Sequence, residues 1–96
     1  MPLYAFIGTD GPRGIDLRKI HRQAHLAGLD ELVAQDRIAH AGPLLDSGGG
    51  PVGSVVIFEA DDLDSARAFA ARDPYVVEGI FERWQLHETK VVRGRS

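Results

Sequence analysis

The segment Ser54-Val55-Val56-Ile57-Phe58-Glu59-Ala60 (SVVIFEA) is the clearest strand in the sequence. β-Branched and aromatic residues dominate it, and such residues are favoured on a pleated surface. Apolar residues fall on both of its faces, which is typical of a strand that is covered on both sides. A glycine-rich turn, Asp46–Gly53, precedes it, and Arg37–Leu45, rich in small apolar residues, precedes that turn. The sequence therefore predicts two neighbouring strands joined by a flexible turn.

Two amphipathic helices are predicted outside this pair of strands. Asp16 is a plausible N-cap for a helix that runs to about Asp36, with one broad apolar arc formed by Leu17, Ile20, Ala24, Leu29, Leu32 and Val33. Asp61 or Asp62 caps a second helix, whose buried face would carry Leu63, Ala66, Phe69 and Ala70. Pro74 disfavours a continuation of this helix beyond Asp73, so we expect a bend over 74–79.

The two ends of the chain supply the remaining strands. Met1–Gly8 places Tyr4 and Phe6 on one face, and Thr9-Asp10-Gly11-Pro12 then breaks the strand. Ile80–Glu88 alternates, with Ile80, Trp84 and Leu86 facing the core, and Val91-Val92 adds a short final strand.

The predicted order is strand, helix, strand, strand, helix, strand. This is the ferredoxin-like βαββαβ order, an α+β fold with a four-stranded antiparallel sheet. Two helices cannot cover both faces of such a sheet, so we expect both on one face. The apolar outer face then needs a second copy packed sheet to sheet, which predicts a homodimer of the α+β barrel type.

Size and composition narrow the class of protein. The 96 residues leave room for one domain, 1–96. The net charge of −3 and the lack of a basic patch argue against a nucleic-acid partner. No apolar run approaches the ~20 residues of a membrane helix, and the first ten residues lack the features of a secretory signal. We therefore expect a cytoplasmic protein. Because the sequence has no cysteine, disulfides and Cys-based metal sites are excluded.

His25 is the most informative residue for function. It shares a helical row with Leu29 and Leu32, so it lies within the apolar arc, and Arg22 lies towards the margin of the same arc. One interpretation is a core histidine hydrogen-bonded to a carbonyl, with Arg22 extending to the rim. The other is a general base in a pocket, with Arg22 binding an anionic substrate. His21 and His25 are four residues apart, but Arg22 beside them disfavours a metal ion, so we expect no metal site.

Four further residues are candidates for the same site. Asp46 either orients His25 or is an ordinary turn aspartate. Ser54 either lines a pocket beside His25 or bonds to the backbone. Asp73 and Tyr75 either close a pocket or serve as a cap and a packing residue. Spacing alone leaves each of these alternatives open.

Four segments that together cover most of the chain carry a resemblance to known proteins. They are Arg22–Leu26 (RQAHL), Arg37–Pro43 (RIAHAGP), Gly53–Ala60 (GSVVIFEA), and Asp73–Val76 (DPYV) with Gly79-Ile80-Phe81. In these segments the chain resembles the YciI-like family of YCII-related domains. The resemblance implies a dimeric α+β barrel with a site around His25 and a nearby aspartate. Asp46 is the best match for that aspartate and Asp73 the second choice, while Arg22 and Ser54 match pocket-lining positions.

Three hypotheses for function follow. In the first, the protein is a cofactor-free enzyme in which His25, paired with Asp46, removes a proton from a small anionic cyclic or aromatic-derived metabolite. Arg22, Ser54, Asp73 and Tyr75 would then contact the substrate, and lyase, isomerase or dehalogenase-type elimination would all fit one base. In the second, the same pocket binds a metabolite without turnover. In the third, Arg22 and His25 only fix the helix on the sheet.

Overall fold

Four strands form one antiparallel sheet in the order β2-β3-β1-β4. A computed structural model describes residues 1–94 of the chain. The strands are β1 (Leu3–Asp10), β2 (Ile38–Leu45), β3 (Pro51–Glu59) and β4 (Phe81–Thr89). The central pair is β1 and β3, so the clearest predicted strand lies in the middle of the sheet.

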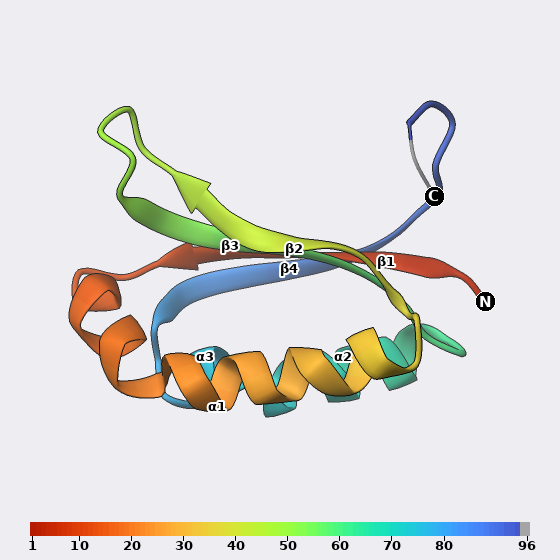
Figure 1. Cartoon of the computed structure of the whole chain (residues 1–96), viewed down its shortest axis with the longest axis horizontal. Helices are drawn as coiled ribbons and strands as arrows, with labels where there is room; N and C mark the ends of the chain where they lie inside the picture. The colour runs from red at the N-terminus through yellow and green to blue at the C-terminus, as the bar shows by residue number, and fades with distance from the viewer. Residues whose placement is uncertain (95–96) are drawn as a thin grey trace.

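All helices lie on one face of this sheet, and the other face is bare (Figure 1). They are α1 (Gly14–Ala34), α2 (Leu63–Arg72) and the short α3 (Pro74–Val77). The expected bend over 74–79 thus contains one helical turn, which begins at a proline because proline suits the first position of a helix. The element order and the one-sided helices confirm the predicted ferredoxin-like α+β fold.

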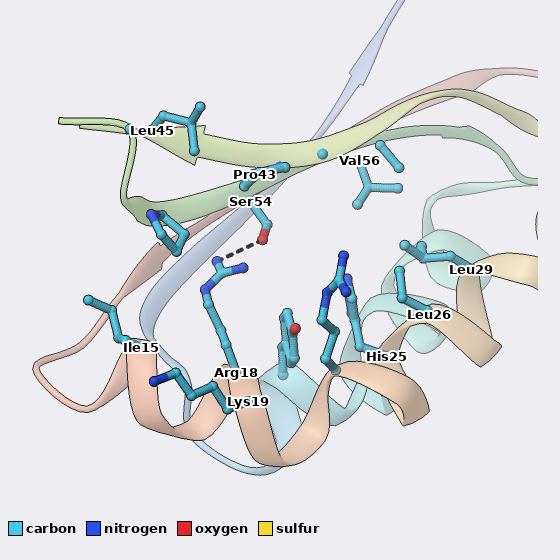
Figure 2. A pocket seen from close by; sticks show the side chains of 16 residues that line it. Ile15, Arg18, Lys19, His25, Leu26, Leu29, Pro43, Leu45, Ser54 and Val56 are labelled. Atoms are coloured by element: carbon cyan, nitrogen blue, oxygen red, sulfur yellow. Dashed lines mark hydrogen bonds between the residues drawn. The ribbon is translucent and has the colours of Figure 1, made fainter. Parts of the chain in front are cut away.

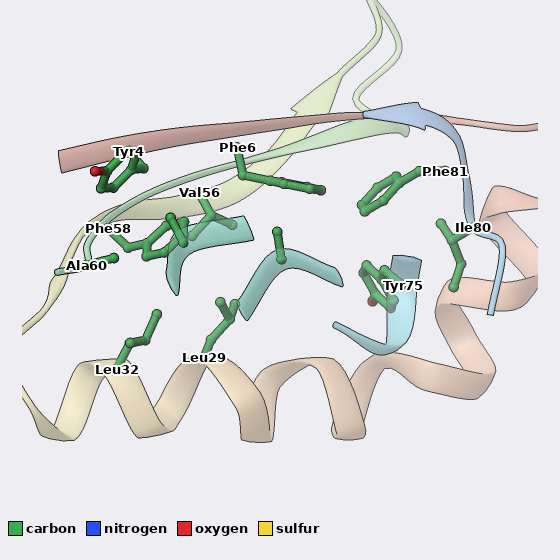
Figure 3. Close-up of a cluster of buried hydrophobic side chains, with 12 residues drawn as sticks. Tyr4, Phe6, Leu29, Leu32, Val56, Phe58, Ala60, Tyr75, Ile80 and Phe81 are labelled. Atoms are coloured by element: carbon green, nitrogen blue, oxygen red, sulfur yellow. The ribbon is translucent and has the colours of Figure 1, made fainter. Parts of the chain in front are cut away.

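The core fills the space between sheet and helices (Figure 3). Tyr4 and Phe6 share one face of β1, as predicted. This face points towards the helices, where the two rings meet Val56 and Phe58 of β3. The helices contribute the buried residues Leu29, Leu32, Ala66 and Ala70. Phe69, Trp84 and Leu86 pack against this cluster as expected, whereas Leu63, predicted to be buried, is 42% exposed. Leu63 is the first residue of α2, and so it lies at the edge of the packed face.

The ends of several elements differ from the prediction. The first helix begins at Gly14, so Asp16 lies in its first turn and is not its N-cap. β1 continues to Asp10 because Thr9 and Asp10 still pair with β4. Val91 and Val92 form no strand, because the pairing of β1 with β4 stops at Leu3 and Thr89. Of the two possible caps of α2, Asp62 is the one whose side chain accepts the Ser65 backbone N–H.

Two further observations concern the outside of the molecule. On the bare face, Ile7 of β1 lies opposite Val55 of β3, and Ala5 lies opposite Ile57, which gives a continuous apolar surface.

Over residues 1–94, none of the helices combines the length and the apolar character needed to cross a membrane.

Candidate functional site

A cavity of about 600 Å³ lies between helix α1 and the strands β2 and β3 (Figure 2). Three cations of α1 line it, namely Arg18, Lys19 and Arg22, and no carboxylate is among the described residues of its wall. Most of the remaining wall is apolar, and it includes Leu26, Leu29, Pro43 and Val56. Such a wall favours a small ligand that combines an apolar body with negative charge.

His25 lies on the buried side of α1, as its helical phase predicts, and is 8% exposed. Its Nδ1 atom is 2.9 Å from both carboxylate oxygens of Asp73. The partner is thus a carboxylate, and not the carbonyl of the core-histidine interpretation. Because a carboxylate accepts a hydrogen bond here, the neutral imidazole carries its proton on Nδ1 and its lone pair on Nε2.

The second ring nitrogen of His25 is open to the cavity. Nε2 has no hydrogen-bond partner among residues 1–94. Among residues 1–94, Arg37 Nε is the one fully buried side-chain nitrogen or oxygen that lacks a partner. His25 Nε2, which also lacks a partner, is therefore not fully buried. His25 is also part of the cavity wall. A lone pair that faces a cavity, with the other nitrogen held by a carboxylate, is the arrangement of a general base.

The short segment between α2 and α3 holds both partners of His25. The Oδ1 atom of Asp73 accepts the backbone N–H of Tyr75 at 2.8 Å, which fixes the carboxylate at the start of α3. The Tyr75 ring stacks on the His25 ring, with centroids 3.9 Å apart and planes 5° from parallel. Burial raises the pKa of the Tyr75 hydroxyl, and Arg18 and Arg22 oppose this rise, so the hydroxyl keeps its proton at neutral pH.

The predicted pairing of His25 with Asp46 does not form. Asp46 lies in the turn between β2 and β3, where its Oδ1 atom accepts the backbone N–H groups of Gly48 and Gly50, both at 2.9 Å. Its carboxylate therefore serves the turn, which was the alternative interpretation of this residue. Asp73, the second choice for the partner, occupies the position.

The two arginines of the cavity differ in how they are held. Arg22 is exposed and makes no hydrogen bond or ion pair within residues 1–94, so its charge is available to a ligand. Arg18 is held by an ion pair: its Nε and Nη2 atoms donate to the two carboxylate oxygens of Asp10 at 2.8 and 2.9 Å. The hydrogen bond to Asp10 is the main cause of a raised pKa of Arg18.

Ser54 completes the polar part of the wall. Its hydroxyl oxygen accepts a hydrogen bond from Arg18 Nη2 at 3.0 Å (Figure 2). The same nitrogen also donates to the Gly53 carbonyl oxygen, 2.8 Å away. Ser54 thus lines the cavity, and its hydroxyl bonds to a side chain of α1 and not to the backbone. The site brings together Arg22, His25, Ser54, Asp73 and Tyr75, and it leaves Asp46 in the turn.

Sequence reasoning missed Arg18 and Asp10. Arg18 stands four residues before Arg22 and seven before His25, so it shares their helical row, and that spacing was the available signal. Asp10 was interpreted only as a turn residue. Its carboxylate meets Arg18 because β1 continues two residues further than expected.

Comparison with known proteins identifies relatives of this chain. The family model of the YCII-related domain matches residues 2–90. The Protein YciI of Escherichia coli is 36% identical over 96 residues, which cover 94% of this chain and 98% of that protein. An uncharacterized protein of Haemophilus influenzae is 37% identical over 84 residues, which cover 81% of this chain and 86% of its own length.

A solved structure extends the comparison to an enzyme. It is 5-chloro-2-hydroxyhydroquinone dehydrochlorinase from Burkholderia phenoliruptrix, in complex with 2,5-dihydroxybenzoquinone. The two chains are 31% identical and superpose with a TM-score of 0.83 over 92% of this chain and 93% of the other.

Proposed function

This chain belongs to the family of YCII-related domains, and on that premise we propose that it is a small enzyme with one general base, the His25–Asp73 pair. The observation that carries the proposal is the 2.9 Å contact from Nδ1 to the Asp73 carboxylate, with Nε2 facing a cavity lined by cations. The substrate is a small anionic ring compound, and the side chains of the protein alone supply the chemistry.

The reaction that fits one base is an elimination or isomerisation. Nε2 of His25 takes a proton from the ring substrate, and the electron pair of the broken bond forms a new double bond. In an elimination, an anionic leaving group departs with its own bonding pair, while Asp73 stabilises the imidazolium. Arg22 neutralises the substrate charge, and Ser54 donates a hydrogen bond to it. The likeness to a dehydrochlorinase, whose name describes such a loss of HCl, supports this class of reaction.

A homodimer is the assembly that this proposal includes. The sheet face opposite the helices carries Ala5, Ile7, Val55 and Ile57 without any covering element among the described residues. An apolar surface of this kind is covered in a stable soluble protein, and a second copy packed sheet to sheet covers both surfaces at once.

The test uses 5-chloro-2-hydroxyhydroquinone as the first probe and measures chloride release. We expect turnover by the wild type, and a loss of about 100-fold or more in His25→Gln and in Asp73→Asn. Asp46→Asn is the matched control, because it removes a nearby carboxylate that serves only the turn, and it keeps the wild-type rate. Circular dichroism verifies that each variant is folded.

Two results would contradict the proposal. If His25→Gln retains the wild-type rate, His25 is not the base. If the wild type binds 2,5-dihydroxybenzoquinone but turns over no member of a panel of chlorinated, lactone and enol ring compounds, the protein is a ligand-binding module, which is the second candidate.

A further inference from the structure

The hydroxyl of Ser54 is engaged as an acceptor and not as a donor. Ser54 is 4% exposed, and its oxygen accepts a hydrogen bond from Arg18 Nη2. A guanidinium can only donate, so this contact leaves the hydroxyl hydrogen of Ser54 unused. Within residues 1–94 the hydroxyl donates to no acceptor, and Ser54 belongs to the cavity wall. The hydrogen is therefore available to a ligand in the cavity.

Arg18 is held too firmly to be the primary receptor of a charged ligand. Its side chain is 12% exposed and that of Asp10 is 7% exposed, and the two form a bidentate ion pair. Nη2 has two hydrogens but three acceptors, namely Asp10, Gly53 and Ser54, so at least one hydrogen is shared. The guanidinium also lies 5.1 Å from the centre of the Tyr75 ring. Its charge is balanced by Asp10, in contrast to that of Arg22.

These contacts give the two arginines different roles. We propose that Arg18 is a positioning residue that fixes Ser54 as a hydrogen-bond donor into the cavity, and that this donor selects ring ligands with a carbonyl or oxyanion opposite the end bound by His25. The inference rests on the proposed function for its ligand class. His25 approaches from the helix side of the cavity and Ser54 from the sheet side (Figure 2), so a ligand that satisfies both carries two ring oxygens.

The experiment measures binding, and so it does not depend on turnover. The probes are 2,5-dihydroxybenzoquinone, which carries oxygens around its ring, and phenol, which carries a single oxygen. In isothermal titration calorimetry, we expect Ser54→Ala to weaken binding of the quinone about 10- to 100-fold, as for a lost hydrogen bond to a charged group. The affinity for phenol stays within about twofold, and Ser54→Thr restores quinone binding because it keeps the hydroxyl.

A double-mutant cycle separates positioning from a structural role. Arg18→Met weakens quinone binding as Ser54→Ala does, and the double variant is no weaker than either single variant, because both remove the same donor. Asp10→Asn is the control: it removes the charge of the ion pair and lowers the melting temperature, but an amide oxygen still accepts from Arg18, so the affinity is retained.

The possible outcomes decide the inference. It is overturned if Ser54→Ala binds the quinone as the wild type does, if Ser54→Ala weakens phenol binding equally, or if the effects of the two substitutions add. Should Arg18→Met fail to fold, the contrast between Ser54→Ala and Ser54→Thr still decides whether the hydroxyl is the donor. If the wild type shows this binding pattern but turns over none of the probes, the proposed base is contradicted and the role of Arg18 and Ser54 is not.

Discussion

At the scale of single residues, the tripeptide Asp73-Pro74-Tyr75 builds half of the candidate site. Asp73 accepts one hydrogen bond from the Tyr75 backbone and another from His25, and the Tyr75 ring stacks on the imidazole. The cap of a four-residue helix therefore also orients the imidazole of His25. A single substitution in this turn affects both local structure and chemistry, which is why a matched control elsewhere in the chain is needed.

The orientation of His25 gives the first prediction. Because Asp73 accepts from Nδ1, we expect a long-range 1H–15N spectrum of neutral His25 to show a protonated Nδ1 and an unprotonated Nε2. Asp73→Asn weakens this preference and produces a mixture of the two tautomers, while Asp46→Asn leaves the spectrum unchanged. A wild-type spectrum with the proton on Nε2 would refute the pairing.

The residues of the site were predictable to different degrees. The burial of His25 follows from its helical row with Leu29 and Leu32, which is a local signal. Its partner is not a local property, since 48 positions separate His25 from Asp73, and both Asp46 and Asp73 follow apolar segments. Only the packing of α3 against α1 decides between them. Arg18 escaped notice because a charged residue on a helix is normally solvated.

At the scale of elements, the start of α1 is shaped by a close approach. A Cβ atom at Gly14 would fall on the carboxylate of Asp10, whereas a Cβ at Gly28 on the same helix would meet nothing within 4 Å. We expect Gly14→Ala to lower the free energy of unfolding by about 1–3 kcal/mol, as overpacking does. Gly28→Ala raises it by about 0.5–1 kcal/mol, because alanine favours the helix.

Urea unfolding followed by circular dichroism measures both variants of α1. The displaced Asp10 would also release Arg18, so Gly14→Ala weakens binding of 2,5-dihydroxybenzoquinone, whereas Gly28→Ala does not. Equal stability of the two variants would show that the turn before α1 absorbs the extra methyl group.

The cap of α2 predicts a dependence on pH. Hydrogen bonding to Ser65 lowers the pKa of Asp62 below its usual value of 3.8. The unfolded chain therefore takes up this proton at higher pH than the folded one, so the stabilisation is present above the usual pKa and is lost as the pH falls through the folded pKa. We expect Asp62→Ala to lower the melting temperature at pH 7 but hardly at all at strongly acidic pH.

Thermal unfolding across this pH range tests the cap. Asp61→Ala is the control, because it removes the same charge from the neighbouring position, which does not cap the helix. A loss of stability in Asp62→Ala that is equal at all pH values would contradict the role of the ionised carboxylate.

The elements themselves were largely predictable, while their ends were not. Periodicity identified all four strands and both long helices, because each buries an apolar face. The ends depend on partners instead. Val91 and Val92 have the composition of a strand, but the pairing of β1 with β4 stops at Leu3 and Thr89 and does not reach them. Gly14 starts a helix without a side-chain cap, so a search for capping residues placed the start at Asp16.

At the scale of the whole molecule, the bare face of the sheet governs assembly. We expect the wild type to sediment at about twice the 10.5 kDa of one chain. Ile57→Lys places a charge in the middle of the apolar surface and gives a species of one chain, while binding of 2,5-dihydroxybenzoquinone measures whether the cavity on the other side is intact. Val33→Lys, on an exposed position of α1, leaves the mass unchanged.

Sedimentation equilibrium over a range of protein concentrations distinguishes these cases. A wild type of single-chain mass at all concentrations, or an Ile57→Lys variant that keeps the wild-type mass, would contradict the assembly proposed for this face.

The wall of the cavity formed by β2 is hydrogen-bonded to the rest of the sheet along one edge only. Strand β2 is an edge strand, paired only with β3, and its register shifts at both of its ends. Pro43 has no backbone N–H, and β2 contributes Ala41, Gly42, Pro43 and Leu45 to the cavity wall. We therefore expect a ligand to enter and leave the cavity past β2, so that the rate of ligand exchange depends on how often this strand opens. An occupied site would in turn slow amide exchange along β2 more than along the central strands.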